Sequence, residues 1–225
     1  MNVVSNVQKA GPWGNQNTLD ELESKHQGLM KDGQKEALPK VNTLDPQGRI
    51  WMGSYPGAGE TEEALRKLDV LINELGIKTF LCLQETEELE ELSPYLPLCE
   101  KVVSTKDPSK RAPNFMHFSI RDVDIADDKA LLTYLKTVLI PKIEKGDILP
   151  LYIHCKGGNG RTGTVSALLL THLFGLDAFT ALEKVAAYHS TRRTPIFSAP
   201  ETYEQKSQVV RLAPLLNKEV EEVKK

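Results

Sequence analysis

The stretch of residues 149–174 constrains this chain more than any other, because it joins two apolar segments through a glycine-rich loop. Residues 149–154 have the length and composition of a buried strand, and residues 165–174 those of a helix. Between them the sequence reads His-Cys-Lys-Gly-Gly-Asn-Gly-Arg-Thr-Gly, residues 154–163. This order predicts a strand, a tight loop and a helix, which together form the repeating unit of an α/β fold.

The loop is suited to bind an anion, and it carries a sulfur nucleophile at its start. Three of its residues are glycines, which adopt unusual backbone dihedrals at little steric cost, so the N–H groups of residues 156–161 can point inward. The following helix turns the positive end of its dipole toward the same place. Arg161 adds a planar fork that can bind two phosphate oxygens, and the same positive field favours a thiolate at Cys155.

The loop sequence HCKGGNGRTG resembles the HC-x5-R-[ST] signature of the cysteine-dependent protein tyrosine and dual-specificity phosphatases. The resemblance covers residues 47–215, and it implies phosphomonoester hydrolysis through a phosphocysteine, without a metal ion or another cofactor. Residues 54–57 are also similar to a turn in the kinase-associated phosphatases. The alternation of strands and helices along the chain indicates the fold that the family implies: an α/β domain with a central, mostly parallel sheet flanked by helices on both faces.

The chemistry of phosphate transfer assigns roles to the residues of the loop. Cys155 is the expected nucleophile, while Arg161 and the loop amides stabilise the equatorial oxygens of the transferring group. Thr162 is expected to donate a hydrogen bond to the departing sulfur, and His154 supports the loop in the resembled family. A helix-capping hydroxyl and an ordinary core histidine are the structural alternatives. The predicted phosphate-binding residues are Lys156, Gly157, Gly158, Asn159, Gly160 and Arg161.

A leaving oxygen needs a proton, which a carboxylic acid on a nearby loop can supply. Residues 118–128 follow a predicted strand, precede a predicted helix and contain four aspartates. In the resembled family the acid follows this strand on a mobile loop, often in the pattern P-x-x-D, and here Ser119 replaces the proline before Asp122. We therefore assign the general acid to Asp122, with Asp124 as the alternative.

Two further positions match supporting roles in the resembled family. Residues 198–205 resemble the stretch that carries a water-positioning glutamine, which indicates Gln205, with Gln208 or a solvated helix face as alternatives. Cys82 ends a predicted strand over residues 77–83, where some relatives have a cysteine that forms a reversible disulfide with the nucleophile. A redox partnership of Cys82 with the nucleophile is therefore one hypothesis, and a buried free cysteine is the other.

The substrate class is predicted from the loop and from what surrounds it. The sequence contains no long tyrosine-recognition loop, so we expect a shallow pocket and dual-specificity activity on phosphotyrosine, phosphoserine and phosphothreonine in proteins. Lys156 also follows the nucleophile in related phosphoinositide phosphatases, but Asn159 replaces the second lysine of their loop. A phosphoinositide or inositol phosphate substrate is therefore the alternative, and an inactive phosphate-binding scaffold is the second alternative.

Composition restricts the remaining classes of function. The 225 residues suit one sizeable globular domain with extensions, with 40% hydrophobic and 26% charged side chains. The net charge of −3 gives no reason to expect nucleic acid, and no apolar stretch reaches the roughly 18 residues that span a bilayer. Three widely spaced cysteines favour a reducing compartment, so we expect the cytosol, with the nucleus as the alternative. The oligomeric state is left open.

The chain divides into a polar, partly flexible extension over residues 1–46, a catalytic domain over residues 47–217 and a charged tail over residues 218–225. Hydrophobic periodicity predicts alternating elements within the domain. Predicted strands cover residues 49–55, 77–83, 101–103, 115–120 and 149–154, and predicted helices cover residues 61–75, 85–92, 131–139, 165–174, 178–189 and 201–216.

Overall fold

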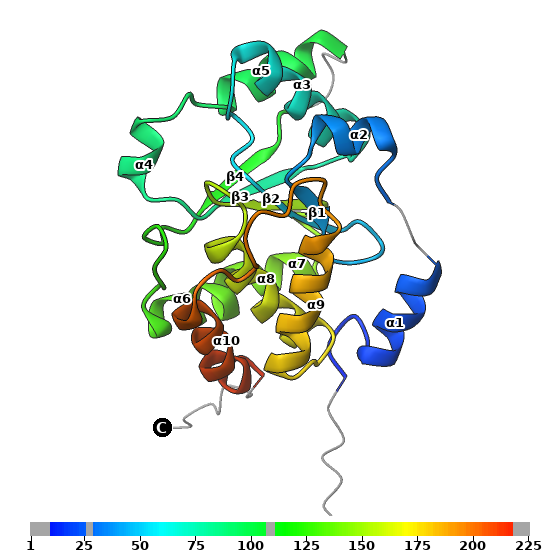
Figure 1. Ribbon diagram of the computed structural model, residues 1–225, viewed down its shortest axis with the longest axis vertical. Helices are drawn as coiled ribbons and strands as arrows, with labels where there is room; N and C mark the ends of the chain where they lie inside the picture. The colour runs from blue at the N-terminus through cyan, green and yellow to red at the C-terminus, as the bar shows by residue number, and fades with distance from the viewer. Residues whose placement is uncertain (1–9, 26–28, 107–110, 218–225) are drawn as a thin grey trace, which may run out of the picture.

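The computed structural model describes residues 10–25, 29–106 and 111–217, and it contains a five-stranded sheet. The strands are β1 (Val41–Thr43), β2 (Ile50–Gly53), β3 (Thr79–Cys82), β4 (Asn114–His117) and β5 (Leu151–His154). Their order is β1-β2-β5-β3-β4, with β1 antiparallel to β2 and all other neighbours parallel. Figure 1 shows the sheet between two groups of helices. The carboxyl ends of β2, β5, β3 and β4 therefore share one edge, where the glycine-rich loop begins.

Helices cover both faces of this sheet, which confirms the predicted α/β class. One face carries α2 (Asp32–Ala37), α3 (Thr61–Asp69), the π-helical turn η1 (Val70–Glu74) and α5 (Leu96–Lys106). The other face carries α6 (Asp128–Tyr134), the π-helical turn η2 (Leu135–Leu139), α7 (Ile140–Glu144), α8 (Gly160–Leu173), α9 (Ala178–Ser190) and α10 (Tyr203–Leu216). Two short helices, α1 (Gln16–Lys25) and α4 (Thr86–Glu90), lie at the margins of the view.

The side chains of the central strand β5 alternate between two hydrophobic cores. Leu151 and Ile153 join the core that includes α8, whereas Tyr152 joins the core that includes α3 and α5. This alternation follows from the two-residue period of a strand, and it makes β5 buried on both faces. His154 consequently faces the same side as Tyr152, and Cys155 is the first residue beyond the strand.

The folded unit begins before the boundary predicted between residues 46 and 47. β1 lies inside the predicted extension and pairs with β2, so the boundary falls between two neighbouring strands. Leu19 and Leu44 are fully buried in the core that includes α8. The polar composition of residues 1–46 gave no sign that part of this segment belongs to the folded unit. A few buried side chains are enough to attach a short segment to the core. Residues 1–9 and the predicted tail over residues 218–225 lie outside the described part.

One local prediction is corrected by the structure. Residues 101–103 belong to helix α5 and form no strand, because Cys99, Val102 and Val103 are buried at helical spacing. The helix predicted over residues 131–139 was expected to kink or end at Pro141, and it continues past this residue as α7. The π-helical turn η2 ends at Leu139, two residues before the proline, and such a turn accommodates a local break in the usual hydrogen-bond pattern.

Candidate active site

Cys155 opens the segment of residues 155–161, here called the phosphate loop, between β5 and α8. The residue is buried, with 3% of its surface exposed, and the N–H of Gly158 donates a hydrogen bond to its Sγ over 3.2 Å. Gly158 has a φ of +76°, and a Cβ there would lie 2.2 Å from the backbone carbon of Gly53. Only glycine therefore allows the loop to pass this close to β2 and turn an N–H toward the sulfur.

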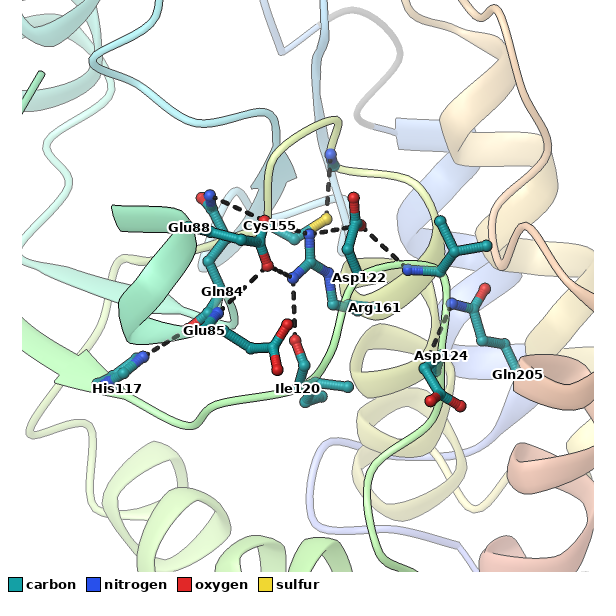
Figure 2. Close-up of polar contacts among 12 residues, drawn as sticks. Gln84, Glu85, Glu88, His117, Ile120, Asp122, Asp124, Cys155, Arg161 and Gln205 are labelled. Carbon is teal, nitrogen blue, oxygen red and sulfur yellow. Dashed lines mark hydrogen bonds and ion pairs between the residues drawn. The ribbon is translucent and has the colours of Figure 1, made fainter. Parts of the chain in front are cut away.

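Arg161 is held by three groups from other parts of the chain, as Figure 2 shows. Its Nη1 donates to a carboxylate oxygen of Glu88 and, over 2.9 Å, to the carbonyl oxygen of Ile120. Its Nη2 donates to the second carboxylate oxygen of Glu88 over 3.1 Å and to Oδ1 of Asp122 over 2.7 Å. The guanidinium group is almost completely buried, so this shell of acceptors determines where it points.

Glu88, which lies in α4 beyond the end of β3, was not predicted from the sequence. An acidic run follows β3 in the sequence, and the carboxyl end of β3 lies next to that of β5, where the loop begins. This acidic run was the signal that could have indicated a carboxylate partner for Arg161. Burial would raise the pKa of this carboxyl group. The hydrogen bond and the charge of Arg161 outweigh burial and hold the pKa of Glu88 below its ordinary value of 4.5. Glu88 therefore remains a carboxylate at neutral pH.

The structure separates the two candidate acids. Asp122 contacts Arg161, and half of its side chain is exposed beside the phosphate loop. Asp124 turns away: its Oδ1 accepts a hydrogen bond from the N–H of Ile125, and its carbonyl oxygen accepts one from Gln205. Only Asp122 is therefore placed to reach a group bound over Cys155.

A cavity of about 30 Å³ lies over Cys155. Its lining residues are Asp122, Val123, Cys155, Gly157, Asn159, Gly160, Arg161, Glu201 and Gln205. One water needs roughly 10–15 Å³ of such space, so the cavity is smaller than a phosphate group requires. The side chains of Arg161 and Asp122 form part of this lining, and a bound phosphate must take over hydrogen bonds that they now make to one another.

Gln205 rather than Gln208 lies at this cavity. Gln205 is almost fully buried, and its Nε2 donates to the carbonyl oxygen of Asp124 over 3.1 Å. A Cβ on Gly160 would lie 2.6 Å from the side chain of Gln205, so α8 and α10 meet tightly here. Gln208 instead donates to the carbonyl oxygen of Ala126, outside the residues that line the cavity.

His154 and Thr162 are buried behind the phosphate loop. Nε2 of His154 forms a hydrogen bond with the hydroxyl of Tyr95 over 2.8 Å, and burial lowers the pKa of the imidazole to about 3. His154 is therefore neutral and packs within the core behind the start of the loop. The hydroxyl of Thr162 is buried without a hydrogen-bond partner among the described residues, and the N-cap of α8 is Asn159, so Thr162 does not cap the helix.

Two residues of the phosphate loop, Lys156 and Asn159, make side-chain contacts away from Cys155. Lys156 is exposed and lines a separate cavity of about 200 Å³ beside Tyr55. The side-chain oxygen of Asn159 accepts hydrogen bonds from Nε2 of His189 over 2.9 Å and from Nη1 of Arg192 over 3.2 Å. Asn159 also lines the cavity over Cys155, while its side-chain oxygen is committed to His189 and Arg192. Arg192 is a second buried arginine near the loop that the sequence did not single out.

Cys82 lies at the end of β3, opposite His154 in the register of β3 and β5. It is fully buried as a free thiol, and burial raises its pKa to about 11. The sulfur thus lies one strand away from the start of the phosphate loop. The hypothesis of a redox partnership with Cys155 stays a prediction.

Within residues 10–25, 29–106 and 111–217, no group of three histidine, cysteine, aspartate or glutamate side chains is arranged to hold a metal ion. No helix of this described part is long and apolar enough to cross a bilayer.

Comparison with known proteins connects this site to a family. A family model described as "Swiss Army Knife protein, DSP-PTPase phosphatase domain" matches residues 54–209. Protein 067L of Invertebrate iridescent virus 3, whose name refers to a tyrosine phosphatase, is 33% identical over 81 residues. The aligned part is 36% of this chain and 34% of that protein, so the match spans about a third of the curated relative.

Solved structures share the fold over most of the chain. Tk-PTP in its active form is 26% identical, with a TM-score of 0.56, and the match covers 78% of this chain and 97% of that chain. Kinase associated phosphatase with its catalytic cysteine replaced by serine is 17% identical, with a TM-score of 0.58, over 80% and 96% of the two chains. PTPMT1 in complex with PI(5)P is 14% identical, with a TM-score of 0.57, over 78% and 96%. The last two show likeness of fold alone.

The Glu88–Arg161 pair predicts a pH-dependent stability. Glu88→Gln removes a charged partner of a buried guanidinium group and should lower the free energy of unfolding by about 1–3 kcal/mol at pH 7. Because the folded-state pKa of Glu88 lies below 4.5, this contribution is fully present above pH 4.5 and disappears as the pH falls through the folded-state value. Urea unfolding between pH 7 and pH 3 measures the difference from the wild type. Glu87→Gln, on the exposed side of α4, is the matched control, and a difference that does not shrink in acid contradicts the assignment.

Proposed function

Because this chain belongs to the Swiss Army Knife DSP-PTPase phosphatase domain family, we propose that it hydrolyses phosphomonoesters through a phosphocysteine formed on Cys155. One observation supports the proposal most directly. The sulfur receives an N–H from Gly158 and lines the same small cavity as Arg161 and Asp122. The proposed nucleophile and cation of the phosphate loop and the proposed acid of the segment after β4 thus converge over one end of β5.

In the proposed first step the Cys155 thiolate attacks phosphorus, an S–P bond forms and the bond to the leaving oxygen breaks. The loop N–H groups and Arg161 stabilise charge on the three equatorial oxygens. For this, the guanidinium group of Arg161 exchanges its hydrogen bond to Asp122 for one to a phosphate oxygen. Glu88 keeps one edge of the fork fixed, so the group needs only a small adjustment when phosphate binds.

Asp122 serves as the proposed general acid once phosphate has replaced it on Arg161. A carboxylate next to a phosphate dianion experiences like-charge repulsion, which favours its protonated form. It then transfers this proton to the leaving oxygen, and the resulting carboxylate accepts a proton from the attacking water in the second step. The S–P bond breaks, inorganic phosphate leaves and the thiolate is restored. Gln205 is suited to orient the water and Thr162 to donate a hydrogen bond to the departing sulfur.

Phosphorylated proteins are the proposed substrate class, with dual specificity. The narrow cavity is lined by loop backbone and a few side chains, and nothing in it selects for a long aromatic substituent. A phosphoinositide or inositol phosphate is the second candidate, favoured by the exposed Lys156 directly after the nucleophile. PTPMT1, which shares the fold, has been solved with PI(5)P. A thiol nucleophile suits a reducing compartment, so the cytosol is the proposed location and the nucleus the alternative.

Release of inorganic phosphate tests the proposed reaction and ranks the substrates. The wild type should release phosphate from phosphotyrosine and phosphothreonine peptides faster than from phosphoinositide in vesicles, and Cys155→Ser should abolish release from all three. The opposite ranking supports the lipid alternative. A wild type that binds phosphate but releases none identifies a phosphate-binding scaffold, and equal activity of the wild type and Cys155→Ser excludes the nucleophile.

The two aspartates give a separate prediction. Asp122→Asn should lower kcat by about 10²–10⁴-fold, with little change in the affinity for inorganic phosphate, because it removes proton transfer and leaves the cradle. The loss of rate at alkaline pH, where a general acid is no longer protonated, should also disappear. Asp124→Asn is the matched control and should retain most activity. The assignment is wrong if the two variants exchange these effects.

The redox hypothesis predicts a disulfide between Cys82 and Cys155 after brief peroxide treatment of the wild type, found by mass mapping of peptides. Cys82→Ser should instead accumulate irreversibly oxidised Cys155, because no neighbouring thiol traps the sulfenic acid. Cys99, a buried thiol in α5, is the control and should stay reduced. A free Cys82 in wild-type protein with an oxidised Cys155 rules out the partnership.

A further inference from the structure

Arg192, in the segment after α9, lies buried directly behind the phosphate loop and takes no part in the reaction described above. Its Nη2 donates to the carbonyl oxygen of Gly158 over 3.0 Å, and its Nη1 donates to the side-chain oxygen of Asn159 over 3.2 Å. The same guanidinium group reaches the first two strands: Nε donates to Asn42 over 2.6 Å, and Nη2 to the carbonyl oxygen of Met52 over 3.3 Å. One side chain thus joins β1, β2 and the loop.

The contact with Gly158 determines where the next N–H of the loop points. In a planar trans peptide, the carbonyl oxygen of one residue and the N–H of the following residue point in opposite directions. Since Arg192 holds the carbonyl of Gly158 on the rear side of the loop, the N–H of Asn159 is directed to the front, where Asn159 lines the cavity over Cys155. Arg192 therefore orients a phosphate-binding N–H without touching the phosphate.

The charge of Arg192 is unusual because it is buried without an ion pair among the described residues. All of its hydrogen-bond acceptors named above are neutral amide and carbonyl groups. Burial lowers its pKa to about 10, so the guanidinium group is still positive at neutral pH, and Cys155 is among the groups that favour this charge. A buried charge left unpaired is costly, and an anion bound at the front of the loop would offset that cost.

His189 and Asn159 complete this arrangement. Burial, with a smaller contribution from the nearby charge of Arg192, lowers the pKa of His189 to about 4. The imidazole is therefore neutral at physiological pH, and its Nε2–H donates to Asn159. Two donors thus fix the Asn159 side chain on the rear side of the loop, so the loop is held from behind over two consecutive residues.

We propose that Arg192 is a positioning residue of the phosphate loop: it fixes the backbone of Gly158 and Asn159 and adds positive charge behind the anion site. This inference rests on the proposed function, since it concerns how the same loop binds phosphate. It also assigns β1 a role, because Asn42 anchors the guanidinium group from the edge of the sheet.

The experiment compares Arg192→Met with Arg193→Met, its neighbour in sequence, whose side chain is 57% exposed and lies 3.5 Å from Glu36. Calorimetry measures the dissociation constant of inorganic phosphate, and an aryl phosphate assay measures kcat and KM. Arg192→Met should weaken phosphate binding about 10-fold and lower kcat by about 10²-fold, as expected when loop donors lose their orientation. Arg193→Met should leave both quantities within about twofold of the wild type.

Two further variants separate the effect of the charge of Arg192 from that of its hydrogen bonds. They also provide a test if Arg192→Met does not fold. Arg192→Lys keeps the charge but not the fork, so it should restore part of the phosphate affinity and little of kcat. Asn159→Ala removes one of the four hydrogen bonds of Arg192 named above together with the hydrogen bond from His189. In combination with Arg192→Met it should add little further loss, because both side chains act through the same loop backbone. If Arg192→Met fails to fold, Arg192→Lys and Asn159→Ala decide the question.

Thermal unfolding is recorded for every variant, since a merely structural residue would lower the melting temperature without weakening phosphate binding to the folded protein. Unchanged phosphate affinity and kcat in a folded Arg192→Met, or in both Arg192→Lys and Asn159→Ala, overturn the proposal. A wild type that binds phosphate without hydrolysing it refutes the proposed function separately, and the calorimetric comparison then still tests Arg192.

Discussion

The buried guanidinium group of Arg161 is the interaction on which the site depends. It lies at the start of α8, and its acceptors come from α4 and from the segment after β4. Because a buried cation needs acceptors, these segments are drawn to the carboxyl edge of the sheet. Asp122 is thereby placed at the same cavity as Cys155, so the group proposed to bind phosphate oxygens also positions the proposed acid.

The phosphate loop is supported on two sides by groups of different chemistry. In front, Gly158 turns its N–H to the sulfur of Cys155, which the close approach of the backbone of Gly53 permits only to glycine. Behind, Arg192 holds the carbonyl of Gly158. In a trans peptide the carbonyl of Gly158 and the N–H of Asn159 point to opposite sides. Fixing the carbonyl from the rear therefore turns the N–H of Asn159 to the front. The positive potential of the cradle is thus prepared before an anion binds.

The family match covers residues 54–209, whereas β1 and β2 lie ahead of it in the chain. These strands nevertheless belong to the same sheet, and they supply two acceptors, Asn42 and Met52, for Arg192. The N-terminal segment is therefore connected to the phosphate loop through one side chain. This connection explains how a polar stretch with little periodicity becomes part of the folded unit.

The sequence alone determined the α/β class, because it follows from periodicities within short segments. It also located the glycine-rich loop in a run of consecutive residues and, through the family resemblance, led to Asp122 as the proposed acid. The roles of the loop residues remain expectations, since they concern a reaction. Tertiary structure decided the rest: Glu88 lies 73 residues from Arg161, and Arg192 lies 34 residues from Gly158. A local sequence pattern cannot predict such distant pairs, because these residues come together only after the strands have assembled into the sheet. The side-chain contacts of Lys156 and Asn159 were likewise decided by folding, because the Lys156 side chain lines another cavity and the side-chain oxygen of Asn159 accepts from Arg192 and His189.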